Sequence, residues 1–250
     1  SEKYNKITIK EIIRNIKSIY SQLGTRYIKI NSIGSKSSFE EYFFDNFYIL
    51  ETTFQQIIID LKKYKYSRNI KTLGLIFSIF NYSICTQKQN IDEKLIDSIL
   101  KDIEKRVSLS LCDFEFLPVA ITSNILIASY NACENNHIEE LKQLIILAKN
   151  LALIDFDELL INNYSVEKVL LKDPSKTYDK LTDESKHFFR RTIVKIAEKT
   201  NTGEYEVAAE ALLKAKAAII GTKENDIGYH IINHHAIVSK RVNIGKGAIK

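Results

Sequence analysis

The residues that end helices and turn strands are scarce in this chain: its 250 residues include only 8 glycines and 2 prolines. Sheet-rich folds need such residues at turns about every ten positions, and the sequence does not supply them. Its apolar residues recur instead with the 3.6-residue period of an α-helix, as Ile9, Ile12 and Ile16 illustrate. The sequence therefore predicts an all-α protein, a multi-helix bundle with a smaller helical unit at its C-terminal end.

Amphipathic or apolar segments of helical length follow one another between short polar loops. A change of composition near residues 155–175 predicts a boundary between an N-terminal helical bundle, residues 1–155, and a smaller helical subdomain, residues 156–250, which ends in a basic tail. The predicted helices span residues 7–23, 38–63, 70–85, 90–106, 113–135, 136–153, 156–162, 165–171, 182–199, 203–220 and 225–238.

Several of these helices carry signals at their ends. Pro118 falls near the first turn of its predicted helix, where proline is tolerated, and Gly221 predicts the end of helix 203–220. Capping signatures, in which a short polar residue is followed three positions later by a glutamate, predict three helix starts. These pairs are Ser38 with Glu41, Asn90 with Glu93, and Asn136 with Glu139.

Composition narrows the class of protein. The net charge of +5 comes from lysines spread along the chain, which we interpret as a solvated surface and not as a nucleic-acid-binding face. Cys85, Cys112 and Cys133 lack metal-site spacing and predict reduced thiols in a cytosolic protein. The apolar run at residues 73–80 is about half a membrane span, so we expect that the chain does not cross a bilayer.

The chain contains no methionine, so we expect it to be an internal piece of a longer protein. Neither a signal peptide nor a P-loop, dinucleotide-binding or kinase motif is present in the sequence. Sequence motifs therefore identify no active site.

Three aromatic residues near the start of the second predicted helix, Tyr42, Phe44 and Tyr48, are candidates for stacking on sugar rings. Glu41 and Asp45 lie one turn apart beside them and match the paired carboxylates of glycoside chemistry, although capping and a solvated face explain them better.

Two further groups are candidates for anion or metal binding. Arg190, Arg191 and Lys195 form a small basic cluster suited to phosphate or anionic lipid, with a solvated face as the alternative. His230 and His234 share a helix face, as metal ligands do, but no acidic or cysteine ligand accompanies them, so no metal site is predicted.

A short acidic motif, Asp155-Phe156-Asp157, has the Asp-x-Asp form by which many glycosyltransferases hold a divalent metal and a sugar diphosphate. Here it follows a helix and not a strand of a nucleotide-binding fold. A helix-capping role therefore explains it better.

Two stretches of the sequence carry a further pattern. The first is Glu-Glu-Tyr-Phe-Phe-Asp-Asn-Phe-Tyr-Ile-Leu-Glu at residues 40–51. The second includes Val166, Glu167, Val169, Leu170, Asp173, Pro174, Tyr178, Thr182, Phe189, Arg190, Arg191, Glu204, Tyr205, Ile227, Gly228 and Tyr229. Together these stretches resemble the N-terminal helical region of cyclic β-1,2-glucan synthases, and the resemblance covers about residues 38–65 and 105–235.

This resemblance implies a parent enzyme in the bacterial inner membrane that makes cyclic β-1,2-glucan from UDP-glucose with a divalent metal. The present chain would be a cytosolic, non-catalytic helical domain without a cofactor, docking against or orienting other domains of the same polypeptide. Two alternatives stay open: a glucan- or carbohydrate-binding module, and a stand-alone helical adaptor that binds protein or nucleic acid.

Overall fold

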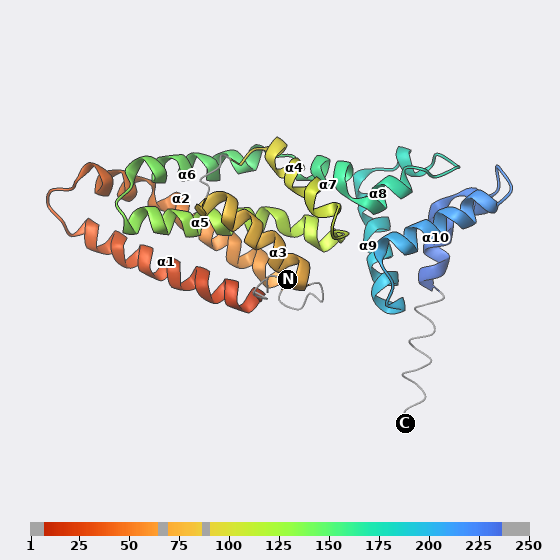
Figure 1. Ribbon diagram of the computed structural model, residues 1–250, viewed down its shortest axis with the longest axis horizontal. Helices are drawn as coiled ribbons and strands as arrows, with labels where there is room; N and C mark the ends of the chain where they lie inside the picture. Colours follow the sequence, from red (N-terminus) through yellow and green to blue (C-terminus); the bar gives the residue numbers. More distant parts are fainter. Residues whose placement is uncertain (1–7, 65–69, 87–90, 237–250) are drawn as a thin grey trace, which may run out of the picture. The chain divides into compact units, whose positions relative to one another are not determined.

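The computed structural model of the chain describes residues 8–64, 70–86 and 91–236, and within these ranges every regular element is helical (Figure 1). The predicted all-α, multi-helix fold is confirmed. Asn90, which is predicted to open a helix, lies outside the described residues. The helix that follows begins at Glu93. At its start, Asp92 Oδ1 accepts a 2.8 Å hydrogen bond from the backbone N–H of Leu95.

Contacts divide the chain into two compact units. Unit 1 comprises Ser1–Leu100 and Cys112–Phe156, and unit 2 comprises Lys101–Leu111 and Asp157–Lys250. The later division lies one residue beyond the boundary that composition predicts. The segment Lys101–Leu111 belongs to unit 2, although its position in the sequence suggests the N-terminal bundle.

Unit 1 is built mainly from long helices. Helix α1 packs against α2, and α2 also packs against α6. Isoleucines and leucines on one face of α1, such as Ile16 and Leu23, are buried, as are Phe43 and Leu50 of α2. The elements are α1 (Ile9–Asn31), α2 (Ser38–Lys63), α3 (Ile70–Asn81), a π-helical turn (Tyr82–Thr86), α4 (Glu93–Glu104, which ends in unit 2), α5 (Leu111–Glu134), α6 (Ile138–Asn150) and a 3₁₀ turn (Leu151–Leu153).

Helix α2 spans the predicted residues, but its N-cap lies one position earlier than the capping signature predicts. The capping box pairs Ser37 with Glu40: Glu40 N–H donates to Ser37 Oγ at 3.3 Å, and Ser37 N–H donates to Glu40 Oε2 at 2.8 Å. The predicted pair of Ser38 and Glu41 is wrong, because two serines and two glutamates stand side by side and fit both registers.

The junction between α5 and α6 also differs from the sequence pattern. Asn136 has a φ of 53°, in the left-handed region that asparagine tolerates, and it ends α5 and does not cap α6. The N–H of His137 donates to Ala132 O at 2.9 Å, and the N–H of Asn136 to Cys133 O at 3.2 Å. These bonds satisfy carbonyls at the end of α5, so the predicted start at Asn136 with Glu139 is corrected.

Helix α5 is, among the described residues, the one helix long and apolar enough to cross a membrane by length and composition. In the structure 72% of its most apolar window is buried within the protein. The run of apolar residues is interrupted by polar ones such as Asn124, whose Nδ2 donates to Phe77 O at 3.0 Å and whose Oδ1 accepts from Asn81 Nδ2 at 2.9 Å. Pro118 lies inside α5, beyond its first turn.

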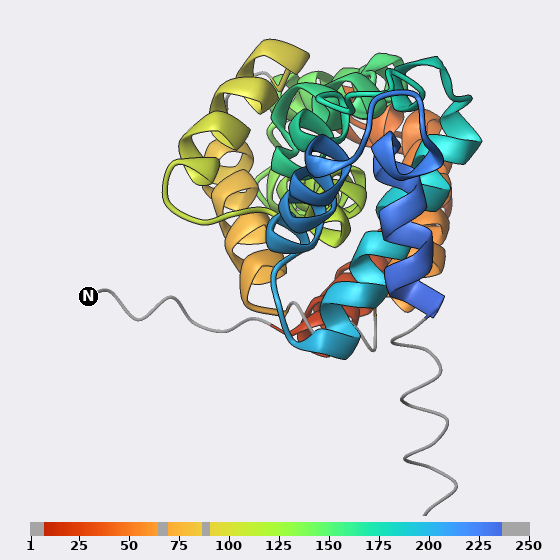
Figure 2. The same cartoon turned by 90° about the vertical axis from the view of Figure 1, so that its right-hand side faces the viewer.

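Unit 2 contains shorter helices around a small core. Helix α10 packs against α8 and α9, and the helix at residues 227–236 lies beside α9 in both views (Figures 1 and 2). Helix α10 ends before Gly221, the predicted stop, which instead occupies a turn. The elements are α7 (Phe156–Asn163), α8 (Ser165–Leu170), a 3₁₀ turn (Tyr178–Lys180), α9 (Asp183–Thr200), α10 (Glu204–Ala217) and a second 3₁₀ turn (Lys223–Asn225).

Gly228 shows how closely the last described helix approaches α9. A Cβ atom at this position would lie 2.7 Å from Cζ of Phe189 and 2.9 Å from Oδ1 of Asp226. Glycine therefore permits the helix start to pack against the Phe189 ring, which a larger side chain would push away.

Candidate functional site

A pocket of about 440 Å³ with both charged and apolar side chains in its lining opens beside α1 in unit 1. Its charged lining residues are Arg26, Lys29, Glu40 and Glu134, and uncharged polar groups and two isoleucines complete the lining. The pocket thus presents cations and carboxylates together, with no excess of either charge.

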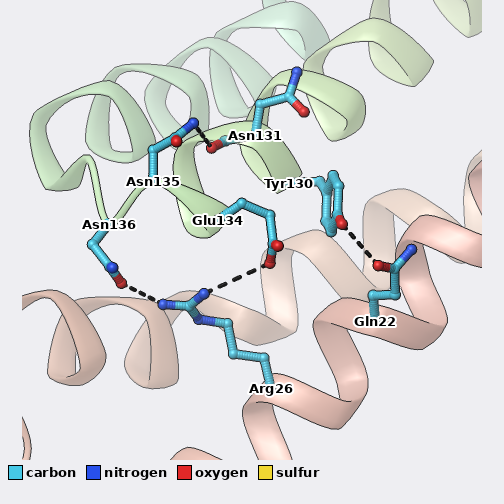
Figure 3. Close-up of polar contacts among 7 residues, drawn as sticks. All are labelled: Gln22, Arg26, Tyr130, Asn131, Glu134, Asn135 and Asn136. Atoms are coloured by element: carbon cyan, nitrogen blue, oxygen red, sulfur yellow. Dashed lines mark hydrogen bonds and ion pairs between the residues drawn. The ribbon is translucent and has the colours of Figure 1, made fainter.

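Arg26 links α1 to the end of α5 at this pocket (Figure 3). Its Nη2 donates a 2.5 Å hydrogen bond to Asn136 Oδ1, and its Nη1 lies 3.8 Å from Glu134 Oε1. The guanidinium carbon lies 5.1 Å from the centre of the Phe39 ring, within cation–π distance. These contacts hold the Arg26 side chain, which is only 24% exposed, in one orientation.

Helical periodicity explains how these groups meet. Gln22 and Arg26 lie four residues apart on α1, and Tyr130 and Glu134 lie four residues apart on α5, so each pair occupies one helix face. The two faces oppose each other, and Tyr130 Oη donates a 2.7 Å hydrogen bond to Gln22 Oε1 beside the Arg26 contact (Figure 3). Two parallel polar contacts therefore cross between α1 and α5.

The chemistry available in the pocket is recognition by hydrogen bonds and charge. Hydrogen bonds from the backbone and side chain of Ser37, aided by the charges of Arg26 and Lys36, hold the pKa of Glu40 below its usual value. Glu40 is therefore an anion at neutral pH and not a proton donor. Within residues 8–64, 70–86 and 91–236 no three His, Cys, Asp or Glu side chains are grouped as a metal ion requires.

The aromatic residues predicted for sugar contact do not form one platform. Phe44 stacks on Tyr27 with ring centres 4.8 Å apart. Tyr42 instead faces Lys142, and the Lys142 Nζ lies 5.8 Å from the centre of the Tyr42 ring. Tyr48 is 61% exposed. Residues two apart on a helix point to opposite sides, which separates Tyr42 from Phe44.

The predicted basic cluster is divided by burial. Arg191 and Lys195 are exposed, but Arg190 is buried and donates from Nε to Glu167 Oε2 at 2.8 Å. Since its charge is engaged inside unit 2, Arg190 does not contribute to a surface for phosphate or lipid.

The other candidates lie in local structural positions. His230, in the helix at residues 227–236, has Nε2 at 2.7 Å from Glu224 O, and neither it nor His234 belongs to a metal-ligating group among the described residues. Asp155 directly precedes α7 and Asp157 lies in its first turn, where carboxylates favour a helix start. Glu41 and Asp45 are both exposed on α2.

Two of the cysteine thiols are protonated at neutral pH. Burial, with a smaller contribution from the charge of Glu140, raises the pKa of Cys85 to about 11. Burial likewise raises the pKa of Cys133 to about 12. Because the thiolate is the reactive form, neither residue is suited to nucleophilic chemistry.

Unit 2 holds a second polar cluster, around two acids that the sequence motifs did not single out as a site. Glu167 Oε2 accepts from Arg190 and also from Tyr178 Oη at 3.0 Å. Asp173 accepts from the backbone N–H of Tyr178 at 3.2 Å and of Ile227 at 3.0 Å. Both acids therefore fasten segments that are distant in sequence.

Asp173 also accepts hydrogen bonds from residues of its own loop. Its Oδ2 accepts from Ser175 Oγ at 2.6 Å and from the backbone N–H of Thr177 at 3.0 Å. Aspartate followed by serine and threonine at these spacings is a turn-forming sequence, and this signal predicts the local loop but not the distant contact with Ile227.

The pKa shifts in this cluster follow from burial and from these bonds. Burial acts to lower the pKa of Arg190, but the hydrogen bond and charge of Glu167 outweigh it and the pKa is raised. Burial acts to raise the pKa of Asp173, but its hydrogen bonds from Ser175, Ile227, Tyr178 and Thr177 outweigh it and the pKa is lowered. Both groups are thus held in their charged forms, as structural ion pairs and caps require.

Comparison with protein-family models, with curated proteins and with solved structures found no match to this chain.

Proposed function

We propose that this chain is a non-catalytic helical domain of a longer membrane glycosyltransferase similar to cyclic β-1,2-glucan synthases. The domain docks against or orients the catalytic part of that enzyme from the cytoplasmic side of a bacterial inner membrane. The parent enzyme uses UDP-glucose and a divalent metal, both bound by other parts of the polypeptide.

One observation carries this proposal: the polar residues of the second family-like stretch converge on two acids. Glu167 is joined by Tyr178 and Arg190, and Asp173 is joined by Tyr178 and Ile227. Residues that brace distant segments in this way maintain a shape, and a shape-holding domain suits docking better than bond-making chemistry. These five residues of the family-like stretch therefore have structural roles in unit 2, which supports the proposal.

The proposal is tested first at the gene. The reading frame after Lys250 is expected to continue into hydrophobic spans and a transferase domain with an acidic metal motif. A stop codon shortly after Lys250 contradicts the proposed context.

A biochemical arm tests the non-catalytic role. The purified chain, incubated with radiolabelled UDP-glucose and Mg²⁺ or Mn²⁺, is expected to form no glucan. Incorporation of glucose by this chain alone contradicts the assignment. If the gene does encode a transferase, replacing Glu167 by Gln in the full enzyme is expected to reduce synthesis without changing the affinity for UDP-glucose, because Glu167 lies outside the transferase part.

A second candidate, carbohydrate binding, is favoured by the pocket at Arg26. Its amide, hydroxyl, carboxylate and guanidinium groups are those that hydrogen-bond sugar hydroxyls, and its volume of about 440 Å³ suits a small ligand. Calorimetric titration with β-1,2-linked glucose oligosaccharides measures this directly. Binding that is lost in Arg26→Met but kept in Tyr48→Ser places the ligand in the pocket, and the absence of heat with the unaltered chain excludes this candidate.

A further inference from the structure

A stripe of exposed residues runs along the solvent side of α2. Its members are separated alternately by four and three positions, so they share one side of the helix. Two of them are large side chains with apolar surface in water, since Tyr48 is 61% exposed and Ile59 is 53% exposed. The stripe, named the α2 stripe, consists of Glu41, Asp45, Tyr48, Thr52, Gln55, Ile59 and Lys62.

The charges of the α2 stripe are separated along its length. Glu41 and Asp45 lie at its N-terminal end, Lys62 lies at its C-terminal end, and the members between them are uncharged. Among the described residues, none forms a hydrogen bond or ion pair with the side chains of these three. The α2 stripe is therefore complementary to a copy of itself that runs in the opposite direction.

The charged residues that border the stripe have partners within the chain. Asp60 Oδ1 lies 2.6 Å from Lys63 Nζ, so these two charges neutralise each other. Glu51 Oε1 accepts a 2.7 Å hydrogen bond from Tyr20 Oη, which holds this carboxylate toward α1. The border residues therefore leave the charge pattern of the α2 stripe as its own members set it.

We propose that the α2 stripe is the interface of a homodimer, in which the stripes of two copies pack antiparallel about a two-fold axis near Thr52. Thr52 lies 11 positions after Glu41 and 10 before Lys62. Antiparallel packing about Thr52 therefore brings Glu41 level with Lys62 of the second copy, and Asp45 lies one turn from the same lysine. A parallel pair would place acid against acid and lysine against lysine, so charge selects the antiparallel arrangement.

The uncharged centre of the stripe fits the same arrangement. Tyr48 lies four positions before Thr52 and Gln55 lies three after it, so these two residues are level across the axis. Ile59 lies one turn beyond Gln55, which brings it beside the Tyr48 ring of the second copy. Packed helices approach to about 8–10 Å between axes, at which distance such side chains interdigitate.

A second copy is the occupant that this surface fits, because a two-fold interface requires one patch that is complementary to itself. The stripe is about 32 Å long at the rise of an α-helix. A single pair of helices lies at the small end of specific interfaces, so we expect a weak dimer with a micromolar dissociation constant. This inference rests on α2 alone and not on the proposed transferase context.

Sedimentation equilibrium tests whether the dimer forms. The mass of the unaltered chain is expected to rise from monomer to dimer between micromolar and several hundred micromolar concentration. Tyr48→Ser is expected to weaken the dimer by about tenfold, because the apolar surface of the ring no longer leaves water. The control is Leu213→Ser on α10, since Leu213 is 69% exposed but lies outside the stripe, and it is expected to have no effect.

A charge exchange tests the antiparallel pairing. Lys62→Glu places like charges opposite Glu41 at both ends and is expected to weaken the dimer by about tenfold. Combining it with Glu41→Lys restores opposite charges across the axis and is expected to bring the affinity back to within about threefold of the unaltered chain. Added salt is expected to reduce these differences. Circular dichroism checks that each variant keeps its helical content.

Cross-linking with a short bismaleimide tests the position of the axis. Thr52→Cys is expected to cross-link efficiently to its own copy, with the unaltered chain as the background for the three native cysteines. Ser38→Cys is expected not to cross-link above that background, because the two copies of residue 38 lie about 40 Å apart in the antiparallel pair.

Three results overturn the inference. The first is a monomer mass at every concentration. The second is a dimer that neither Tyr48→Ser nor Lys62→Glu weakens, which places the contact on another face. The third is cross-linking of Ser38→Cys as efficient as that of Thr52→Cys, which identifies a parallel pair.

Discussion

Arg190 Nε donates a 2.8 Å hydrogen bond to Glu167 Oε2, and the two side chains are only 8% and 1% exposed. The same carboxylate oxygen accepts from Tyr178 Oη at 3.0 Å. A buried ion pair gains little over a well-packed apolar pair, but losing one partner leaves an uncompensated charge in the interior. The stability of unit 2 therefore depends on keeping the two charges paired, and removing one of them costs more than removing both.

Replacing Glu167 by Gln is expected to lower the free energy of unfolding by about 3–5 kcal/mol, since the guanidinium of Arg190 then lies buried without its counter-charge. Urea denaturation followed by circular dichroism measures the change.

The double variant Glu167→Leu with Arg190→Met is expected to be less destabilised than the single variant Glu167→Gln. As a control, Asp102→Ala removes an exposed ion pair with Lys105 in the same unit and is expected to leave stability unchanged. A loss below about 1 kcal/mol in Glu167→Gln contradicts the structural role.

Acid is expected to weaken unit 2 through Asp173. The pKa of this carboxyl is lower in the folded chain than its ordinary value of about 4, so the unfolded chain binds more protons in this range. The stabilisation is therefore complete above the ordinary pKa and is lost as the pH falls below it toward the folded pKa. The stability difference between the unaltered chain and Asp173→Asn should be largest near neutral pH and should shrink in acid. A difference that stays constant with pH disproves this assignment.

Two glycines are expected to respond in opposite ways to alanine. In Gly228→Ala the new Cβ would lie 2.7 Å from the Phe189 ring, and this overpacking should lower the unfolding free energy by about 1–3 kcal/mol. In Gly24→Ala, inside α1, no atom lies within 4 Å of the added Cβ, and the stability should rise by about 0.5–1 kcal/mol. Thermal or urea unfolding of both variants measures the contrast, and destabilisation by Gly24→Ala would show that α1 packs differently.

Because Ser37 and not Ser38 is the N-cap of α2, alanine substitutions at the two serines are expected to have different effects on stability. Ser37→Ala removes the side-chain acceptor for the N–H of Glu40 and should cost about 1 kcal/mol. Ser38→Ala, one position into the helix, should cost less or be neutral, because alanine is the better helix former there. If urea denaturation shows a larger stability loss for Ser38→Ala than for Ser37→Ala, the cap has the register that the sequence signature predicts.

The helical fold follows from the sequence because apolar periodicity repeats over many residues in each segment. A cap depends on one hydrogen bond, so adjacent serines at 37 and 38 leave its register ambiguous. Asn136 illustrates the same limit: asparagine suits both a helix start and the left-handed end of the preceding helix, and only the contacts of α5 decide between them.

The candidate sites were less predictable because their members are distant in sequence. Arg190 stands next to an exposed arginine, but its partner Glu167 lies 23 residues earlier and no local pattern indicates that it is buried. At the pocket, the hydrogen bond from Arg26 to Asn136 joins residues that are 110 positions apart in the sequence. The aromatic set at 42–48 was local, but helical geometry sends its side chains in different directions.

The assignment of Lys101–Leu111 to unit 2 has a consequence for how the protein is made. The backbone N–H of Leu111 donates to Glu204 Oε2 at 2.9 Å, and the two residues are separated by 93 positions. At about 5–20 residues per second, a ribosome adds Glu204 about 5–20 seconds after Leu111. During that interval the segment has left the ribosome without its partner, so unit 2 closes only late in synthesis. Neither unit is released intact by a single proteolytic cut, because the chain passes between them three times.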